Sequence, residues 1–192
     1  MKNIHELVQR RIAETCIGAS SLRNQGAPGV NKAARGFLAK FPLGRFAVSS
    51  MDSFLAVLDE TTEKLKNNLP KDAQNWGAAR KAINLFLRDV LYNRYLSEHY
   101  KLVSIEPFLE IPLDSYVVKE LFALNRTVLP RWRGIKFLHA DDSRLYQNEA
   151  LRYSQELETS RIHLDLIWWR KQSEEAANPN NPTNPSAEER AL

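Results

Sequence analysis

Residues 78–98 place apolar side chains at intervals of three and four positions, the spacing of one face of an α-helix. This face consists of Ile83, Phe86, Leu87, Val90, Leu91 and Tyr95. Comparable stripes occur in the other stretches that we expect to be helical, namely 3–21, 30–40, the segment that ends at Pro70, the residues after Asp114, a helix capped by Asp141 or Asp142 that reaches Leu157, and the residues from Asp165 onward. No sustained alternation of apolar and polar residues indicates a strand, and no internal repeat is present. The sequence therefore predicts an all-α fold.

Breaks and caps separate these helices. The segment NQGAPG at 24–29 interrupts the chain, and 127–140 is expected to be a loop. Ser49 stands three residues before Asp52, the spacing of a capping box, and this helix is expected to stop at Pro70.

The composition favours a globular protein without a bound metal or cofactor. With 192 residues, 43% of them apolar, the chain can form one domain or two small lobes that share a core. No run approaches 18 apolar residues, so no membrane-spanning helix is expected. The single cysteine, Cys16, excludes an internal disulfide and a cysteine-based metal site, and it fits a reducing cytoplasm. The four histidines are scattered and lack metal-ligand spacing.

The formal charge of +4 is unevenly distributed along the chain. Residues 173–192 hold four glutamates and one arginine, a net −3, which leaves +7 for residues 1–172. The acidic segment is rich in Asn and Pro without apolar periodicity, so we expect a disordered tail after a helical domain of residues 1–172. A basic body permits phosphate binding. The alternative is a surface that simply carries spare lysines.

Lys81 lies in NWGAARKAINLFLRD, near the start of the helix predicted from 78 onward. A helix N-terminus is the positive end of the helix dipole, so two adjacent cations, Arg80 and Lys81, are slightly unfavourable there and need a reason. In one interpretation Lys81 belongs to a solvated helix face with Arg88 and Asp89. In the other it faces a cleft, where burial favours a neutral amine that can act as a nucleophile.

Asp114 lies in EIPLDSYVVKEL, where a helix is expected to begin. Asp is a favoured N-cap, so a purely structural role is one interpretation. Lys81 precedes Asp114 by 33 residues, a path of one long helix and a short loop that brings the chain back toward its start. If the two side chains meet in a cleft, the pair suits attack on an acetal-like carbon: the carboxylate stabilises a developing cation and the amine forms a Schiff base.

WGAARKAINLFLRD followed by FLEIPLDSYVVKEL resembles the helix-hairpin-helix DNA glycosylases, and the 33-residue interval with the IPLD step is most similar to the archaeal 8-oxoguanine glycosylase branch. The similarity covers about residues 12–170 in segments. It implies a two-lobed helical bundle with a helix-hairpin-helix element and an active-site cleft between the lobes. It also implies that Lys81 and Asp114 are the catalytic pair.

Further motifs extend the resemblance to base recognition, because a glycosylase must extrude its target base into a pocket. IHLDLIWW is similar to the family's C-terminal stretch, which implies that Asp165 and Trp169 contact the extruded base, with Trp168 as a further aromatic candidate. LRNQG implies the same for Gln25, with Asn24 beside it. The structural alternatives are core packing for one tryptophan, an N-cap for Asp165 and a turn for Asn24 and Gln25.

The resemblance also implies a DNA-binding surface. A hairpin at 70–81 would present backbone amides to phosphates, which makes Trp76, Gly77 and Arg80 candidate contacts. Two arginines in the predicted loop, Arg131 and Arg133, are further candidates, and the alternative for them is an ordinary solvated loop.

Together these features predict a monomeric, cytoplasmic DNA glycosylase that acts on double-stranded DNA containing a modified base and has no membrane association. Abasic-site lyase activity is left open, and no metal or organic cofactor is expected. The base is either oxidised guanine or a modified cytosine of phage DNA, such as glucosylated hydroxymethylcytosine. Two alternatives stay open: a non-catalytic helix-hairpin-helix DNA-binding module, and a protein-interaction domain with an incidental basic charge.

Overall fold

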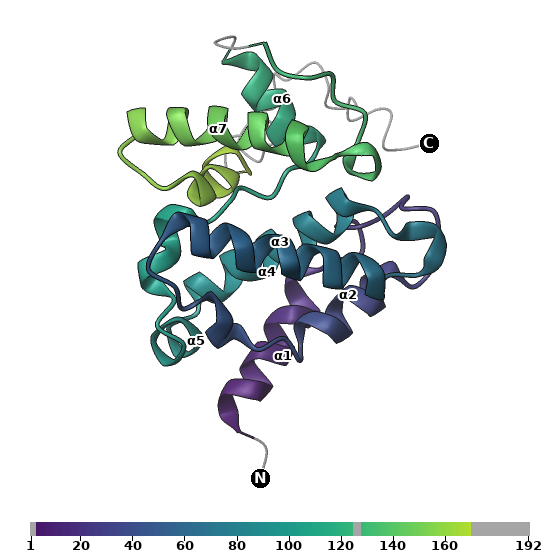
Figure 1. Ribbon diagram of the computed structural model, residues 1–192, viewed down its shortest axis with the longest axis vertical. Helices are drawn as coiled ribbons and strands as arrows, with labels where there is room; N and C mark the ends of the chain where they lie inside the picture. Colours follow the sequence, from purple (N-terminus) through teal and green to yellow (C-terminus); the bar gives the residue numbers. More distant parts are fainter. Residues whose placement is uncertain (1–2, 125–127, 170–192) are drawn as a thin grey trace, which may run out of the picture.

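The computed structural model describes residues 3–124 and 128–169, and every regular element in these ranges is helical (Figure 1). The α-helices are α1 (Ile4–Cys16), α2 (Val30–Leu38), α3 (Met51–Asn68), α4 (Trp76–Tyr92), α5 (Arg94–His99), α6 (Ser115–Ala123) and α7 (Ala140–Glu156). Short 3-10 helices lie between them: η1 (Leu43–Phe46), η2 (Lys71–Ala73), η3 (Val103–Phe108), η4 (Ile135–Phe137) and η5 (Arg161–His163). Residues 164–169 are also helical. The prediction of an all-α fold is confirmed.

The helices lie in two groups, with α6 and α7 on one side of the molecule and α1 to α5 on the other (Figure 1). Their buried apolar side chains form two clusters. The first extends from Ile12 to Leu109 and includes Ile162, and the second extends from Ile111 to Trp168. The chain passes from the first cluster to the second at Glu110, a charged residue that is itself only 6% exposed.

Local capping explains where the structure departs from the helices predicted from sequence. The long helix expected over 78–98 is two helices, α4 and α5, because the side chain of Asn93 accepts a hydrogen bond from the Leu96 amide and starts a new helix there. The N-cap of α3 is Ser50 rather than Ser49. Helix α1 ends at Cys16, earlier than the predicted residue 21.

Helix α4 crosses the centre of the molecule and is buried on most of its circumference. Its first turn packs against η4 so closely that a Cβ atom on Gly77 would lie 2.2 Å from the carbonyl oxygen of Ile135 and 2.8 Å from Cβ of Leu138. Gly77 therefore fixes how the 133–137 segment lies along α4.

Gly77→Ala is expected to destabilise the protein by about 1–3 kcal/mol, because the added methyl group meets backbone that cannot move independently. Gly36→Ala is the matched control, since a Cβ there meets nothing within 4 Å and alanine favours the α2 helix by up to about 1 kcal/mol. Urea unfolding of both variants measures the two shifts, which should have opposite signs. Equal shifts would show that the space beside Gly77 is not restrictive.

Across the two described ranges, no helix is both long enough and apolar enough to cross a membrane. The predicted tail of residues 173–192 lies outside the described residues.

Candidate functional site

A cleft of about 680 Å³ opens where the two groups of helices meet. Five parts of the chain line it: residues 20–25, the α4 side chains Lys81, Leu85 and Arg88, the start of α6 at 114–116, the segment 133–137, and Asp165. The cleft therefore brings together side chains that are up to about 145 residues apart in sequence.

Lys81 and Asp114 face one another in this cleft. Lys81 Nζ donates to Asp114 Oδ2 at 3.2 Å, while Asp114 Oδ1 accepts from the amides of Tyr116 and Val117 at 3.0 Å each. The N-cap prediction for Asp114 is confirmed, and the cap uses only one carboxylate oxygen. Because the cap fixes the rotamer, the second oxygen is held toward the amine. The Lys81 side chain is only 10% exposed, so the solvated-face interpretation is wrong for this residue.

A second ion pair lies along the same face of α4, two turns further on. Arg88 donates through Nη1 to the Asp165 carboxylate and through Nε to Asp89 at 2.8 Å. Burial raises the pKa of Asp165, and the neighbouring Arg88 guanidinium opposes that rise only in part. The structure thus places Asp165, paired with Arg88, in the same cleft as Lys81 and Asp114.

The side chains of Asn24 and Gln25 also line the cleft, and both belong to a tight turn. Asn24 has a positive φ of 63°. Gln25 is 4% exposed, and its amide donates to the Arg23 carbonyl at 2.8 Å. The Asn75 side chain donates to the Gln25 carbonyl at 3.0 Å, which holds this turn against the start of α4. Both residues therefore line the cleft, and the interpretation of this segment as a turn is confirmed.

The two tryptophans of the C-terminal motif have different surroundings. Trp168 is 4% exposed and stacks on Tyr153, with ring centroids 6.0 Å apart, so it is a core residue of the second cluster and not a base platform. Trp169 is 63% exposed, and neither tryptophan lines the cleft.

Three of the predicted DNA contacts have structural roles instead. Arg80 is 5% exposed and pairs with Glu110 and Asp59, so its guanidinium does not face solvent. Trp76 packs against the second cluster, with the Arg80 guanidinium 5.1 Å from its ring centroid. Gly77 is buried against η4, as described above. The prediction that these residues contact phosphates is corrected accordingly: they hold α4 in the core.

The predicted loop arginines remain at the surface. Arg131 and Arg133 are exposed, and Arg133 lines the cleft with its guanidinium 4.9 Å from the Phe137 ring centroid. Two further cations that line the cleft, Arg23 and Lys136, lie in irregular segments and were not predicted from sequence. Neither has a periodic signal, because the position of these segments depends on tertiary packing.

Arg88 could have been found from sequence. Lys81, Leu85 and Arg88 are spaced by four and three residues, so they share one helical face, and a leucine between two cations is a sign that this face is not simply solvated.

Within residues 3–124 and 128–169, no group of three or more His, Cys, Asp or Glu side chains is placed to hold a metal ion. No family model matches the chain, and comparison with curated proteins and with solved structures finds no significant match.

Proposed function

We propose that the protein is a DNA glycosylase that excises a modified base through Lys81 and Asp114. The observation that carries the proposal is the 3.2 Å contact between Lys81 Nζ and Asp114 Oδ2 in a cleft of about 680 Å³. The amine and the carboxylate come from different helices, and the cleft is large enough for a nucleotide extruded from duplex DNA.

The chemistry follows from the two groups. As the glycosidic bond breaks, its electron pair leaves with the base, and positive charge develops on the sugar, where the Asp114 carboxylate stabilises it. Asp114 also accepts a proton from Lys81, whose Nζ lone pair then forms a bond to C1′. The departing base takes up the proton that Asp114 accepted, which restores the carboxylate. Ring opening gives a Schiff base, which either hydrolyses to an abasic site or eliminates the 3′ phosphate.

The helix-hairpin-helix element corresponds in this proposal to α3, the connection 69–75 and α4, and the two lobes correspond to the two apolar clusters. The position of the cleft supports the correspondence of the lobes, because residues from both sides of the boundary at Glu110 line it.

The DNA-binding surface in this proposal consists of Arg23, Arg133 and Lys136, which line the cleft around the reactive pair. Changing all three to glutamine is expected to weaken DNA binding and to reduce the slope of log K against log salt by up to about 0.9 for each phosphate that the protein no longer neutralises. Fluorescence anisotropy over a range of salt concentrations measures that slope. The control is Lys32→Gln with Lys40→Gln, two lysines that line a separate hollow beside α2. An equal decrease of slope in the control would contradict the assignment.

The direct test of the function is base release with borohydride trapping. Wild-type protein is incubated with duplex DNA containing 8-oxoguanine and, separately, with glucosylated phage DNA, and the released bases are identified by mass spectrometry. Sodium borohydride reduces a Lys81 Schiff base to a stable protein–DNA cross-link. Release of a base without any cross-link would remove the nucleophilic role of Lys81. Affinity for DNA with no base release from either substrate would favour a non-catalytic DNA-binding module.

A further inference from the structure

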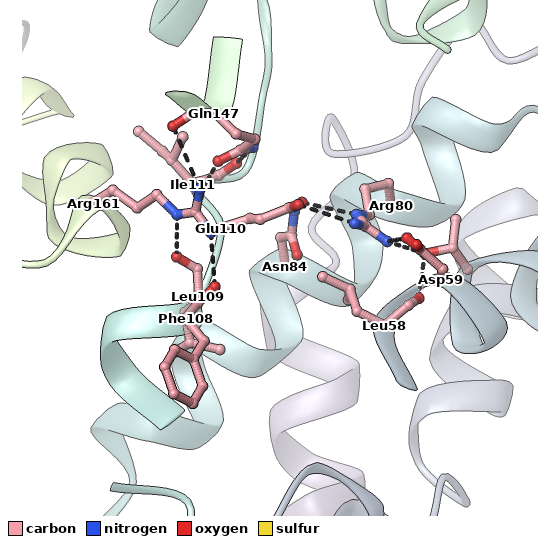
Figure 2. Close-up of polar contacts among 11 residues, drawn as sticks. Leu58, Asp59, Arg80, Asn84, Phe108, Leu109, Glu110, Ile111, Gln147 and Arg161 are labelled. Carbon is pink, nitrogen blue, oxygen red and sulfur yellow. Dashed lines mark hydrogen bonds and ion pairs between the residues drawn. The ribbon is translucent and has the colours of Figure 1, made fainter. Parts of the chain in front are cut away.

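The backbone segment that leads to Asp114 is held in place by hydrogen bonds with two side chains, Gln147 and Arg161. Gln147 on α7 accepts a hydrogen bond from the Ile111 amide at 3.0 Å and donates to the Ile111 carbonyl at 2.8 Å. Arg161 donates to the carbonyls of Leu109 and Phe108, at 2.8 Å each. Figure 2 shows that these two side chains form hydrogen bonds with consecutive peptide groups of the segment.

The same segment is fastened to α4 by a buried ion pair. Arg80 donates to both carboxylate oxygens of Glu110, through Nε at 2.8 Å and Nη2 at 2.9 Å, and Asn84 donates to Glu110 at 3.1 Å (Figure 2). The side chains of Arg80 and Glu110 are each only 6% exposed. Two parallel N–H bonds to a carboxylate fix orientation as well as distance, which a single contact does not.

The sequence positions of these groups relate them to the reactive pair. Arg80 is the residue before Lys81 on α4, and Glu110 and Ile111 precede Asp114 by four and three residues. The clamp, defined as Arg80, Glu110, Gln147 and Arg161, therefore joins the helix that carries the amine to the segment that carries the carboxylate. Side chains with fixed partners on both sides leave little freedom in the Lys81–Asp114 distance.

We propose that the clamp sets the separation of Lys81 and Asp114, and that it controls the rate of the covalent step rather than DNA affinity. Its residues are positioning residues, because none of the four reaches the reactive pair except through the backbone. The rate effect rests on the proposed glycosylase function, whereas the control of the Lys81–Asp114 separation does not. A displacement of about 1 Å between reacting groups can lower a rate by about a hundredfold, so loss of the clamp is expected to have a large effect on chemistry.

The test compares Gln147→Met with Gln9→Met. Gln9 is also buried, and it also makes two hydrogen bonds to backbone groups, the carbonyls of Leu38 and Phe41, but it lies on α1 away from the cleft. Base release under single-turnover conditions and DNA affinity are measured for both. We expect Gln147→Met to lower the rate at least about tenfold with affinity within about twofold of wild type. Gln9→Met, with a similar loss of thermal stability, should keep the wild-type rate.

A second readout does not depend on glycosylase activity. Lys81 is shielded by Asp114, so displacement of Asp114 should speed the reductive methylation of Lys81 by formaldehyde and cyanoborohydride, followed by peptide mass spectrometry. We expect the methylation rate of Lys81 to rise at least about threefold in Gln147→Met, an order-of-magnitude estimate for an amine released from a carboxylate. In Gln9→Met the rate should not change. If wild type releases no base, the proposed function fails and this labelling still decides on the clamp. Unchanged labelling in Gln147→Met would overturn the clamp proposal, as would equal base-release rates in the two variants.

Discussion

Lys81→Gln is expected to abolish the borohydride cross-link and to lower base release by about 10³-fold or more, because the variant has no nucleophile at C1′. DNA affinity should stay within about twofold of wild type, since Lys81 is 10% exposed and contributes little to the surface that meets phosphates. The measurements are trapping on a denaturing gel, single-turnover base release and fluorescence anisotropy. A variant that still forms the cross-link would show that another amine attacks the sugar.

Asp114→Asn separates the chemical role of this residue from its capping role. Asparagine is as good an N-cap as aspartate, so the hydrogen bonds to the Tyr116 and Val117 amides can be kept while the negative charge is removed. We expect the same thermal stability as wild type to within about 1 kcal/mol, and a loss of base release of about 10²–10⁴-fold. If Asp114 were only a cap, both quantities would stay near wild type.

That Lys81 and Asp114 lie near one another could be predicted from sequence, because the place of each residue near the start of its helix follows from local rules. Asp114 precedes an apolar helical face, which indicates an N-cap, and a cap fixes both the position and the rotamer of its side chain. The expected path of one long helix and a short loop is in fact the rest of α4 followed by α5 and η3, and this path still returns the chain to Lys81. These steps predict only that the two residues lie near one another; in our proposal their separation depends on the long-range contacts of the clamp.

The roles of Arg80 and Trp168 could not be predicted in the same way. Helix α4 is covered on most of its circumference by the rest of the molecule, so adjacent residues face different surroundings: Arg80 faces Glu110 and Lys81 faces the cleft. From the local sequence, an arginine near a helix start is expected to be exposed. Its actual partner, Glu110, lies 30 residues away, so the local pattern does not reveal that the arginine is buried and paired. Likewise, two adjacent tryptophans have equal propensities, and tertiary packing in the second cluster, including the contact with Tyr153, makes Trp168 the buried one.

The largest stability effect is expected for Arg80→Met. Burial alone would raise the pKa of Glu110, but the Arg80 guanidinium, with help from Arg161 and Asn84, holds it below the usual range. Removing Arg80 leaves a buried carboxylate without its main partner, which costs about 3–5 kcal/mol at pH 7. The double variant Arg80→Met/Glu110→Gln removes both charges and should recover most of that loss. Urea unfolding measures the free energy of unfolding of each variant.

The pH dependence gives this prediction a second, signed test. In wild type the folded-state pKa of Glu110 lies below its unfolded value of about 4.3, so the pair stabilises the protein above that pH and the stabilisation is lost as the pH falls. In Arg80→Met, burial should instead raise the folded-state pKa of Glu110 above that value, so the carboxyl group protonates in the folded protein and the penalty shrinks in acid. The difference in unfolding free energy between wild type and Arg80→Met should therefore widen from pH 4 to pH 7. The difference between Arg80→Met and the double variant, which lacks the carboxylate, should widen over the same range. A gap between the two variants that stays constant with pH would show that the cost of Arg80→Met comes from poorer packing and not from the uncompensated charge of Glu110.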